Sequence, residues 1–267
     1  MIGTYASTEV GRFLGVDGLR TFFVERGDGE AVVMLHGAAP GVCAEVSWQP
    51  NAAALAKRGF WTIAYDQPGF GRSDTPTDHS LEYRVQHARA FIDTLGLTHY
   101  HLIGSSAGAY VAARLALEDE RVDRLVLVAG SSLLGQQATT ATAPSPAPTL
   151  ESVRALTERT LYRPELATDE LVRLRYEMSG DTRHDAHLAR QAATPARSIV
   201  VDLPRLTQKT LLLWGKNDGP AAAEQALQLF QLIPGAELHV FDECGHWVQW
   251  DQSARFNRLV ADFLQSA

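Results

Sequence analysis

The stretch HLIGSSAGAY, residues 101–110, places two adjacent serines among small residues at the end of an apolar run. The apolar run predicts a buried strand and the residues after it have helical spacing, so we expect a tight strand-to-helix turn. Residues 104–108 match the pattern G-x-S-x-G, in which Ser106, and not Ser105, takes the nucleophile position. The helix that begins there aims its first N–H groups at a developing oxyanion, so we predict Ala107 as an oxyanion-hole donor.

Short apolar runs and helical patterns alternate along the chain around this turn. This alternation predicts an α/β fold with a mostly parallel central sheet that is covered by helices on both faces. We expect strands at 31–37, 61–66, 100–104, 124–130, 210–215 and 236–242, and helices at 51–60, 79–95, 106–118, 221–233 and 251–267.

The alternation is interrupted in the second half of the chain. Residues 136–149 are uncharged and rich in Ala, Thr, Pro and Ser, a composition that predicts a mobile tether. Residues 150–200 have helical character without strand patterns. We therefore expect a core domain of residues 1–130 and 206–267, with a helical lid inserted at 131–205 over the carboxyl ends of the strands, where ligands bind in open α/β sheets.

A serine nucleophile needs a base and an acid that orients the base, and this architecture carries them in the chain order Ser, Asp or Glu, His. Asp218 follows the strand at 210–215, and His246 follows the next strand, so both fall in loops at one edge of the sheet. We predict Asp218 and His246 as these partners, with Asp242 and Glu243 as alternative acids.

The loop that begins at His36 and Gly37 follows the first strongly apolar strand. In a serine hydrolase of this architecture, that loop supplies the second N–H of the oxyanion hole, so we predict Ala38 as the second donor. The strand leads His36 into a packed turn, and we expect this histidine to be structural.

The composition is that of an ordinary globular protein and argues against several classes of partner. Hydrophobic residues make up 45% of the 267 residues, and the net charge of −7 disfavours nucleic acid and acidic membranes. No apolar run reaches the roughly 18 residues of a membrane span, and the first residues lack a signal-peptide pattern. Cys43 and Cys244 form neither a disulfide framework nor a metal motif, so we expect a cytoplasmic protein without a metal site.

Taken together, these residues resemble the α/β-hydrolase superfamily over nearly the whole chain. Three stretches are similar to the meta-cleavage product hydrolases, which break a carbon–carbon bond in bacterial aromatic catabolism. These stretches are LHGAAPGVCAEVSW (35–48), ATDELVRLRYE (167–177) and CGHWVQWDQSARFNRLVADFL (244–264). The second resembles the family's lid helix, in which an arginine grips the substrate carboxylate, and the matching residue is Arg175.

The resemblance implies a substrate of the 2-hydroxy-6-oxo-hexa-2,4-dienoate type, cleaved with water and no cofactor to 2-hydroxypenta-2,4-dienoate and a carboxylic acid. Arg175 would bind the carboxylate, His246 would relay the proton that turns the dienol into a ketone, and Ser106 would attack the C6 carbonyl. Trp247 would line the pocket beside the dienoate. The resemblance also implies a homodimer or larger homo-oligomer.

The chain departs from the family's pattern at several positions that bear on substrate binding. Ser105 and Ser47 stand where the family has asparagines that hydrogen-bond the dienoate. Ala39 replaces a glycine, Glu45 replaces a tryptophan, and Pro220 replaces a larger residue that shapes the distal pocket. The smaller side chains among these replacements indicate a roomier distal pocket, which an aryl or bulky acyl group would fit.

Two other functions remain open from the sequence. One is a serine carboxylesterase or lactonase that uses the same three residues on a small ester. The other is a protein of the same fold that binds a small ligand without turnover. Dehalogenases and epoxide hydrolases need a carboxylate nucleophile, which Ser106 disfavours. The alternative reading of Arg175 is a solvated charge on the lid helix.

Overall fold

A computed structural model describes residues 11–135, 146–180, 182–193 and 197–266. Eight strands form one sheet in the order β1-β2-β4-β3-β5-β6-β7-β8. The strands from β3 to β8 pair in parallel, whereas β1 and β2 pair antiparallel with each other and β2 pairs antiparallel with β4. The strands are β1 (Arg12–Val16), β2 (Leu19–Arg26), β3 (Glu30–Leu35), β4 (Phe60–Tyr65), β5 (Tyr100–Ser105), β6 (Val122–Val128), β7 (Lys209–Gly215) and β8 (Ala236–Phe241).

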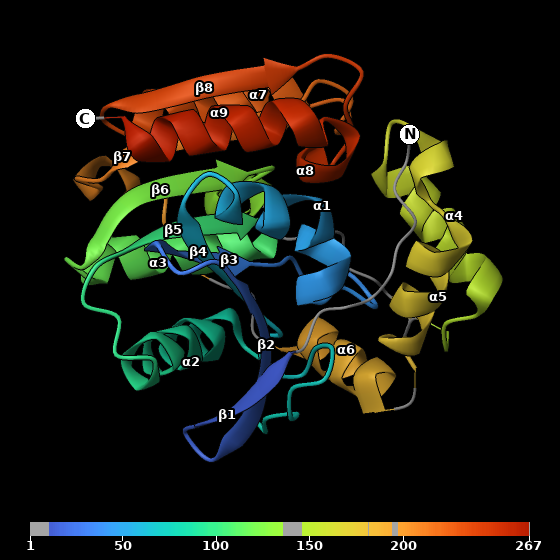
Figure 1. Ribbon diagram of the computed structural model, residues 1–267. Coiled ribbons are helices and arrows are strands. Elements are labelled where there is room, and N and C mark those ends of the chain that lie inside the picture. The colour runs from blue at the N-terminus through green and yellow to red at the C-terminus, as the bar shows by residue number, and fades with distance from the viewer. Residues whose placement is uncertain (1–10, 136–145, 181, 194–196, 267) are drawn as a thin grey trace.

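Helices cover both faces of this sheet (Figure 1). Buried side chains of α2 (Leu81–Thr94), α3 (Ala107–Glu118) and α7 (Ala222–Leu232) form the apolar core on one face. Those of α1 (Ala44–Ala56) and α9 (Ser253–Gln265) form a second core on the other face. The predicted fold class, a mostly parallel sheet between two helical layers, is confirmed.

The segment between β6 and β7 contains helices and no strand among its described residues. They are η1 (Ser131–Leu134), α4 (Leu150–Thr160), η2 (Pro164–Leu166), α5 (Asp169–Glu177), α6 (Thr182–Ala192) and η3 (Leu203–Arg205). Figure 1 places α4 and α5 together beside α1 and α8 (Val248–Asp251). Most of the predicted tether, residues 136–145, lies outside the described residues.

Two features of the fold differ from the sequence prediction. The hairpin of β1 and β2 was not predicted, although Asp17 and Gly18, both with positive φ, make the two-residue turn that such hairpins favour. The helix expected at 51–60 begins earlier, at residue 44, and continues through Pro50. Its first turn is fixed because the Asp66 carboxylate accepts the Ala44 N–H at 2.7 Å, which a sequence pattern does not reveal.

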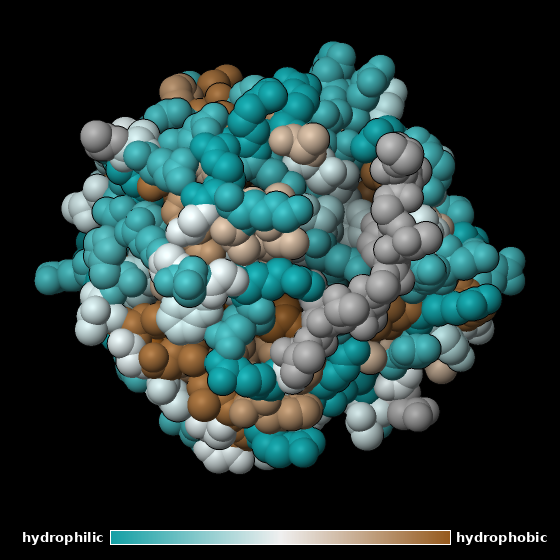
Figure 2. Space-filling view, in the orientation of Figure 1, coloured by the Kyte–Doolittle hydropathy of each residue, from teal (hydrophilic) through white to brown (hydrophobic). Residues whose placement is uncertain are grey.

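The face of the molecule in Figure 2 is mainly hydrophilic, with smaller groups of apolar residues between the polar ones. Among the described helices, none is both long enough and apolar enough to cross a membrane.

The glycines around the turn at 104–108 permit a very close contact between α3 and β3. A Cβ atom at Gly108 would lie 2.3 Å from the Leu35 carbonyl oxygen, and one at Gly104 would lie 2.3 Å from the Gly108 carbonyl oxygen. Both neighbours are backbone atoms and cannot rotate away. The two glycines are therefore required for this packing, whatever the chemistry of the serine between them.

We predict that Gly108→Ala lowers the free energy of unfolding by about 1–3 kcal/mol, because the added methyl overpacks a rigid contact. The matched control is Gly15→Ala in β1, where a Cβ atom would meet nothing within 4 Å and the change should stay within about 0.5 kcal/mol. Urea unfolding of both variants measures the difference. Equal stability of the two variants would contradict this account of the contact.

Candidate active site

Ser106 sits in a strained turn between β5 and α3. Its backbone has φ 56° and ψ −121°, a conformation uncommon for a residue with a side chain. Three contacts hold the turn: the Ser106 N–H donates to the Val128 carbonyl at 2.9 Å, and the Ser106 carbonyl accepts from the Ser132 hydroxyl at 2.8 Å and from the Ala109 N–H at 2.9 Å. Strain held from several sides is typical of an active-site residue.

The loop after β3 lies directly against this turn. A Cβ atom at Gly37 would lie 3.3 Å from Ser106 Cβ and 3.7 Å from Ser106 Oγ. Ala38 follows Gly37, and Ala107 follows Ser106 as the first residue of α3, where its N–H has no partner within the helix. The two predicted oxyanion donors therefore belong to segments that meet at Ser106.

His36 fixes the loop and has no free ring nitrogen. Its Nε2 accepts the Gln67 N–H at 3.0 Å, so Nδ1 carries the proton and donates to the Gly37 carbonyl at 2.8 Å. Burial, and then the charge of Arg84, lowers the pKa of His36 to about 3. The ring is therefore neutral and structural, as predicted.

Asp218 and His246 are in contact at the same edge of the sheet. His246 Nδ1 lies 2.9 Å from Asp218 Oδ2 and 3.0 Å from Oδ1, and both side chains are partly buried. The alternative acid, Asp242, is instead exposed and pairs with Lys216 at 3.1 Å. Because β5, β7 and β8 are parallel, their carboxyl ends place Ser106, Asp218 and His246 on one edge.

The residue that joins the lid to the His246 loop was not predicted from the sequence. The buried carboxylate of Asp251 accepts the N–H groups of Gly245 at 2.8 Å, Tyr162 at 2.9 Å and Arg163 at 3.1 Å. The His246 N–H donates in turn to the carbonyl of Thr160, at the end of α4, at 3.0 Å. A carboxylate within the apolar stretch WVQWD, residues 247–251, was the available signal.

Arg175 of α5 is buried, so the alternative reading of this residue as a solvated charge on the lid helix is wrong. Its guanidinium lies 4.9 Å from the centre of the Trp247 ring, donates from Nε to the Pro40 carbonyl at 3.0 Å, and donates from Nη1 to the Thr157 hydroxyl at 3.1 Å. Nη2 is buried without a hydrogen-bond partner among the described residues, and no described carboxylate forms an ion pair with Arg175. Burial, and then the charge of Arg159, lowers its pKa to about 10.

One apolar cluster connects the lid to this edge of the core, and we call it the lid cluster. Ala38 and Ala39 pack against it, and Trp247 belongs to it. The cluster consists of Val42, Cys43, Val46, Phe70, Val153, Leu161, Ala167, Leu171, Val172, Trp247 and Trp250. Both cysteines, Cys43 and Cys244, are buried.

The positions that depart from the family's pattern have different surroundings. Ser105, at the end of β5, and Ser47, in the first turns of α1, are both buried, and the Ser47 carbonyl faces the Gln249 amide at 3.5 Å. Glu45 pairs with Arg72. Pro220 is exposed in the turn after Asp218, and its predicted contact with substrate stays a prediction.

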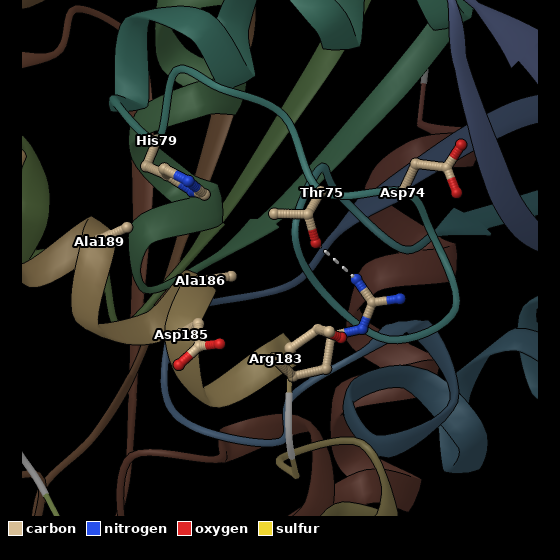
Figure 3. A pocket seen from close by; sticks show the side chains of 8 residues that line it. Asp74, Thr75, His79, Arg183, Asp185, Ala186 and Ala189 are labelled. Atoms are coloured by element: carbon tan, nitrogen blue, oxygen red, sulfur yellow. Dashed lines mark hydrogen bonds between the residues drawn. The ribbon is translucent and has the colours of Figure 1, made fainter.

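A pocket of about 530 Å³ lies elsewhere, between α6 and the segment at 74–79 (Figure 3). Its lining contains none of the predicted site residues. Arg183 crosses the pocket to donate to the Thr75 hydroxyl at 3.1 Å, and Arg190, also on α6, donates to the Gly69 carbonyl at 3.1 Å. These contacts attach α6 to the core beside Phe70.

Comparison with known proteins points to one group of enzymes. A family model described as "Alpha/beta hydrolase family" matches residues 32–259. The chain is 33% identical to a 2-hydroxy-6-oxononadienedioate/2-hydroxy-6-oxononatrienedioate hydrolase of Pseudomonas sp, covering 88% of both chains. It is also 33% identical to a 2-hydroxy-6-oxo-6-phenylhexa-2,4-dienoate hydrolase of Comamonas testosteroni, covering 90% of both chains.

Among solved structures, the chain resembles a mutant of a meta-cleavage product hydrolase from Pseudomonas fluorescens IP01 complexed with acetates. The identity is 34%, the TM-score is 0.85, and the match covers 95% of this chain and 97% of that one.

We predict a contribution of His36 to stability that disappears in acid. The unfolded histidine takes up a proton below pH 6.5, whereas the folded one does so only near pH 3. The contribution is therefore complete above pH 6.5 and falls by about 1.4 kcal/mol per pH unit between these values. In urea unfolding at pH 6.5 and 5.5, His36→Gln should lose about 1 kcal/mol less than the wild type, because half of the unfolded histidine is already protonated at pH 6.5. His184→Gln on α6 is the matched control and should keep the wild-type loss; identical pH dependence in all three proteins would contradict the prediction.

Proposed function

Because the chain belongs to the alpha/beta hydrolase family, with relatives that hydrolyse meta-cleavage products, we propose that it cleaves a 2-hydroxy-6-oxo-hexa-2,4-dienoate with water. The products are 2-hydroxypenta-2,4-dienoate and a carboxylic acid. The proposal includes a homodimer or larger assembly and a cytoplasmic location.

The buried, incompletely paired guanidinium of Arg175 is the observation that carries this choice of substrate. A buried cation with an unused donor is costly unless an anion completes its bonding. A dienoate carboxylate supplies that charge and the acceptor for Nη2. A neutral ester supplies neither, which favours the dienoate over a small ester.

In this proposal Arg175 binds the carboxylate of the substrate. The dienoate chain then lies along Trp247 and extends toward Ser106. His246, oriented by Asp218, takes the proton of the 2-hydroxyl and delivers it to C5, which yields the 2-ketone. Ser106 then attacks the C6 carbonyl, and the N–H groups of Ala38 and Ala107 stabilise the oxyanion.

The remaining steps break the carbon–carbon bond and consume water. The C5–C6 bond breaks, and its electron pair forms the dienolate of the released hydroxypentadienoate, because the 2-ketone accepts that charge. His246 carries the Ser106 hydroxyl proton to the dienolate oxygen, and water hydrolyses the Ser106 acyl ester, which frees the serine and supplies the hydroxyl of the carboxylic acid. Ser105 and Ser47, shorter than the family's asparagines, would reach the dienoate through water molecules.

We expect the purified protein to bleach the yellow dienolate chromophore of a 6-phenyl substrate and of a substrate that ends in a distal carboxylate. Stopped-flow absorbance on both, beside a series of nitrophenyl esters, ranks the substrates by kcat/KM. Fast ester hydrolysis without bleaching would establish the esterase alternative. Binding of either dienoate without turnover would establish the non-catalytic alternative.

The two adjacent serines provide a matched pair in the same assay. Ser106→Ala should lower kcat by at least about a thousandfold, because the nucleophile is lost. Ser105→Ala should keep a substantial fraction of activity, with its effect mainly in KM. The reverse ranking would overturn the assignment of the nucleophile.

We further predict that Arg175→Ala lowers kcat/KM for a dienoate by about a hundredfold or more, because the carboxylate both binds and positions the substrate. Arg175→Lys, which keeps the charge but loses the planar fork, should fall between this variant and the wild type. Arg173→Ala, an exposed position on the same helix, is the matched control. Thermal unfolding checks that the lid remains folded, and unchanged kinetics in folded Arg175→Ala would refute the role of this residue.

A further inference from the structure

A second group of polar side chains gathers at the opposite edge of the sheet. Glu30 begins β3, His99 precedes β5 by one residue, and Asp123 is the second residue of β6. These three strands are neighbours and parallel, so their amino ends meet. The proposed catalytic residues follow carboxyl ends instead, and the two groups therefore lie at opposite edges of the sheet.

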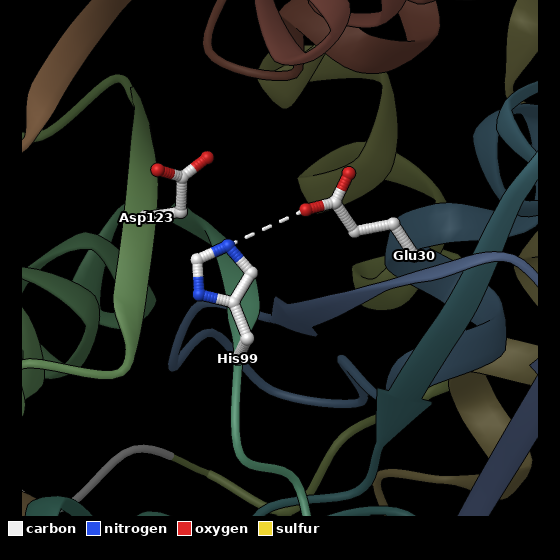
Figure 4. A group of neighbouring side chains, drawn as sticks. All are labelled: Glu30, His99 and Asp123. Carbon is white, nitrogen blue, oxygen red and sulfur yellow. Dashed lines mark ion pairs between the residues drawn. The ribbon is translucent and has the colours of Figure 1, made fainter.

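The three side chains point toward one another (Figure 4). One ligand atom from each lies within 4.8 Å of the other two, and His99 Nε2 is 3.5 Å from Glu30 Oε1. Adjacent ligands of a tetrahedral zinc ion with bonds of about 2.0–2.1 Å lie about 3.4 Å apart. The His99–Glu30 pair has this spacing, and side chains at the surface have the freedom to bring Asp123 closer.

His101 provides an independent indication from inside the protein. Its side chain is only 1% exposed, and within the described residues neither ring nitrogen has a hydrogen-bond partner of good geometry. Nε2 lies 3.3 Å from Glu30 Oε2 and Nδ1 lies 3.4 Å from Asp123 Oδ2. One buried ring therefore faces both carboxylates.

In metal sites an outer shell of polar groups orients the metal-binding carboxylates, and His101 lies in that position relative to Glu30 and Asp123. His101 contacts one oxygen of Glu30 and one of Asp123, which leaves the other oxygen of each for a cation. Arg124 Nε also lies near Asp123, 3.5 Å from its Oδ2.

We propose that Glu30, His99 and Asp123 bind a divalent transition-metal cation of the Zn²⁺ class, with water as the fourth ligand. One imidazole and two carboxylates favour Zn²⁺ over Mg²⁺ or Ca²⁺, which prefer oxygen ligands alone. The ion links the amino ends of β3, β5 and β6, and His101 is a positioning residue. Because the ligands lie at the amino ends of three separate strands, the site has no short sequence motif.

The test is a Zn²⁺ titration of untagged, chelator-stripped protein by calorimetry, with thermal unfolding in parallel. We expect one saturable site at this cluster and a rise in Tm of roughly 5 °C at a hundredfold excess over Kd. His99→Ala and Asp123→Asn should each weaken this binding at least tenfold and should leave dienoate hydrolysis unchanged. Glu237→Gln, at an exposed carboxylate of β8, is the matched control and should bind as the wild type does.

His246→Ala distinguishes this site from the proposed catalytic histidine. If His246→Ala abolishes Zn²⁺ binding and His99→Ala retains it, the ion binds at the catalytic edge and the proposal is wrong. Absence of saturable Zn²⁺ binding to the wild type would also overturn it. Both outcomes are independent of whether the protein cleaves dienoates.

Discussion

The close approach of the Ser106 turn to the end of β3 is the constraint from which the candidate active site follows. Gly108 packs on the Leu35 carbonyl and Gly37 packs on Ser106, with no room for a side chain at Gly108. This contact places the start of α3 and the loop after β3 on adjoining sides of one hydroxyl. The left-handed backbone of Ser106 is then held by hydrogen bonds from β6 and η1, so its strain is supported by the core rather than by a ligand.

The lid is attached to the core at the candidate base. Asp251 accepts N–H groups from both the lid and the His246 loop, and the Thr160 carbonyl accepts the His246 N–H itself. A displacement of α4 would therefore change the backbone that presents His246. Arg175 of the lid also packs on Trp247, the residue after His246. A ligand that binds Arg175 would therefore affect the position of His246 through this contact.

The sequence predicted the parts of this molecule in which local pattern and tertiary structure agree. Buried parallel strands are continuous apolar runs, and the carboxyl ends of such strands meet, so Ser106, Asp218 and His246 could be predicted to lie at one edge of the sheet. The hairpin of β1 and β2 was not predicted, although its turn at Asp17 and Gly18 and the buried run of β2 from Thr21 to Val24 are both visible in the sequence.

The features that the sequence did not predict depend on partners distant in the chain. Helix α1 continues through Pro50 because the Asp66 carboxylate fixes its first turn. The Asp251 carboxylate contacts the lid by accepting backbone N–H groups about 90 residues earlier in the chain. The sequence pattern of α5 alone does not show that Arg175 is buried, because charged residues lie on several faces of this helix. Only the packing of α5 shows which face is turned toward the protein interior.

Comparison of two buried arginines explains why burial alone does not identify a ligand site. Burial lowers the pKa of both Arg84 and Arg175 to about 10. The Arg84 fork binds the Gln67 side-chain carbonyl through Nε and Nη2, and Nη2 also reaches the His36 carbonyl at 3.3 Å. Neutral dipoles of the protein thus replace its hydration, and the residue stabilises the loop that carries His36.

Arg175 has fewer such contacts and retains a buried Nη2 without a partner among the described residues. A donor left unpaired in the interior costs about 1–3 kcal/mol, and more on a charged group. A fold tolerates this cost where a ligand recovers it on binding. The open donor, and not the burial of the charge, is therefore the observation that supports the proposal of an anion at Arg175, whereas Arg84 organises a loop.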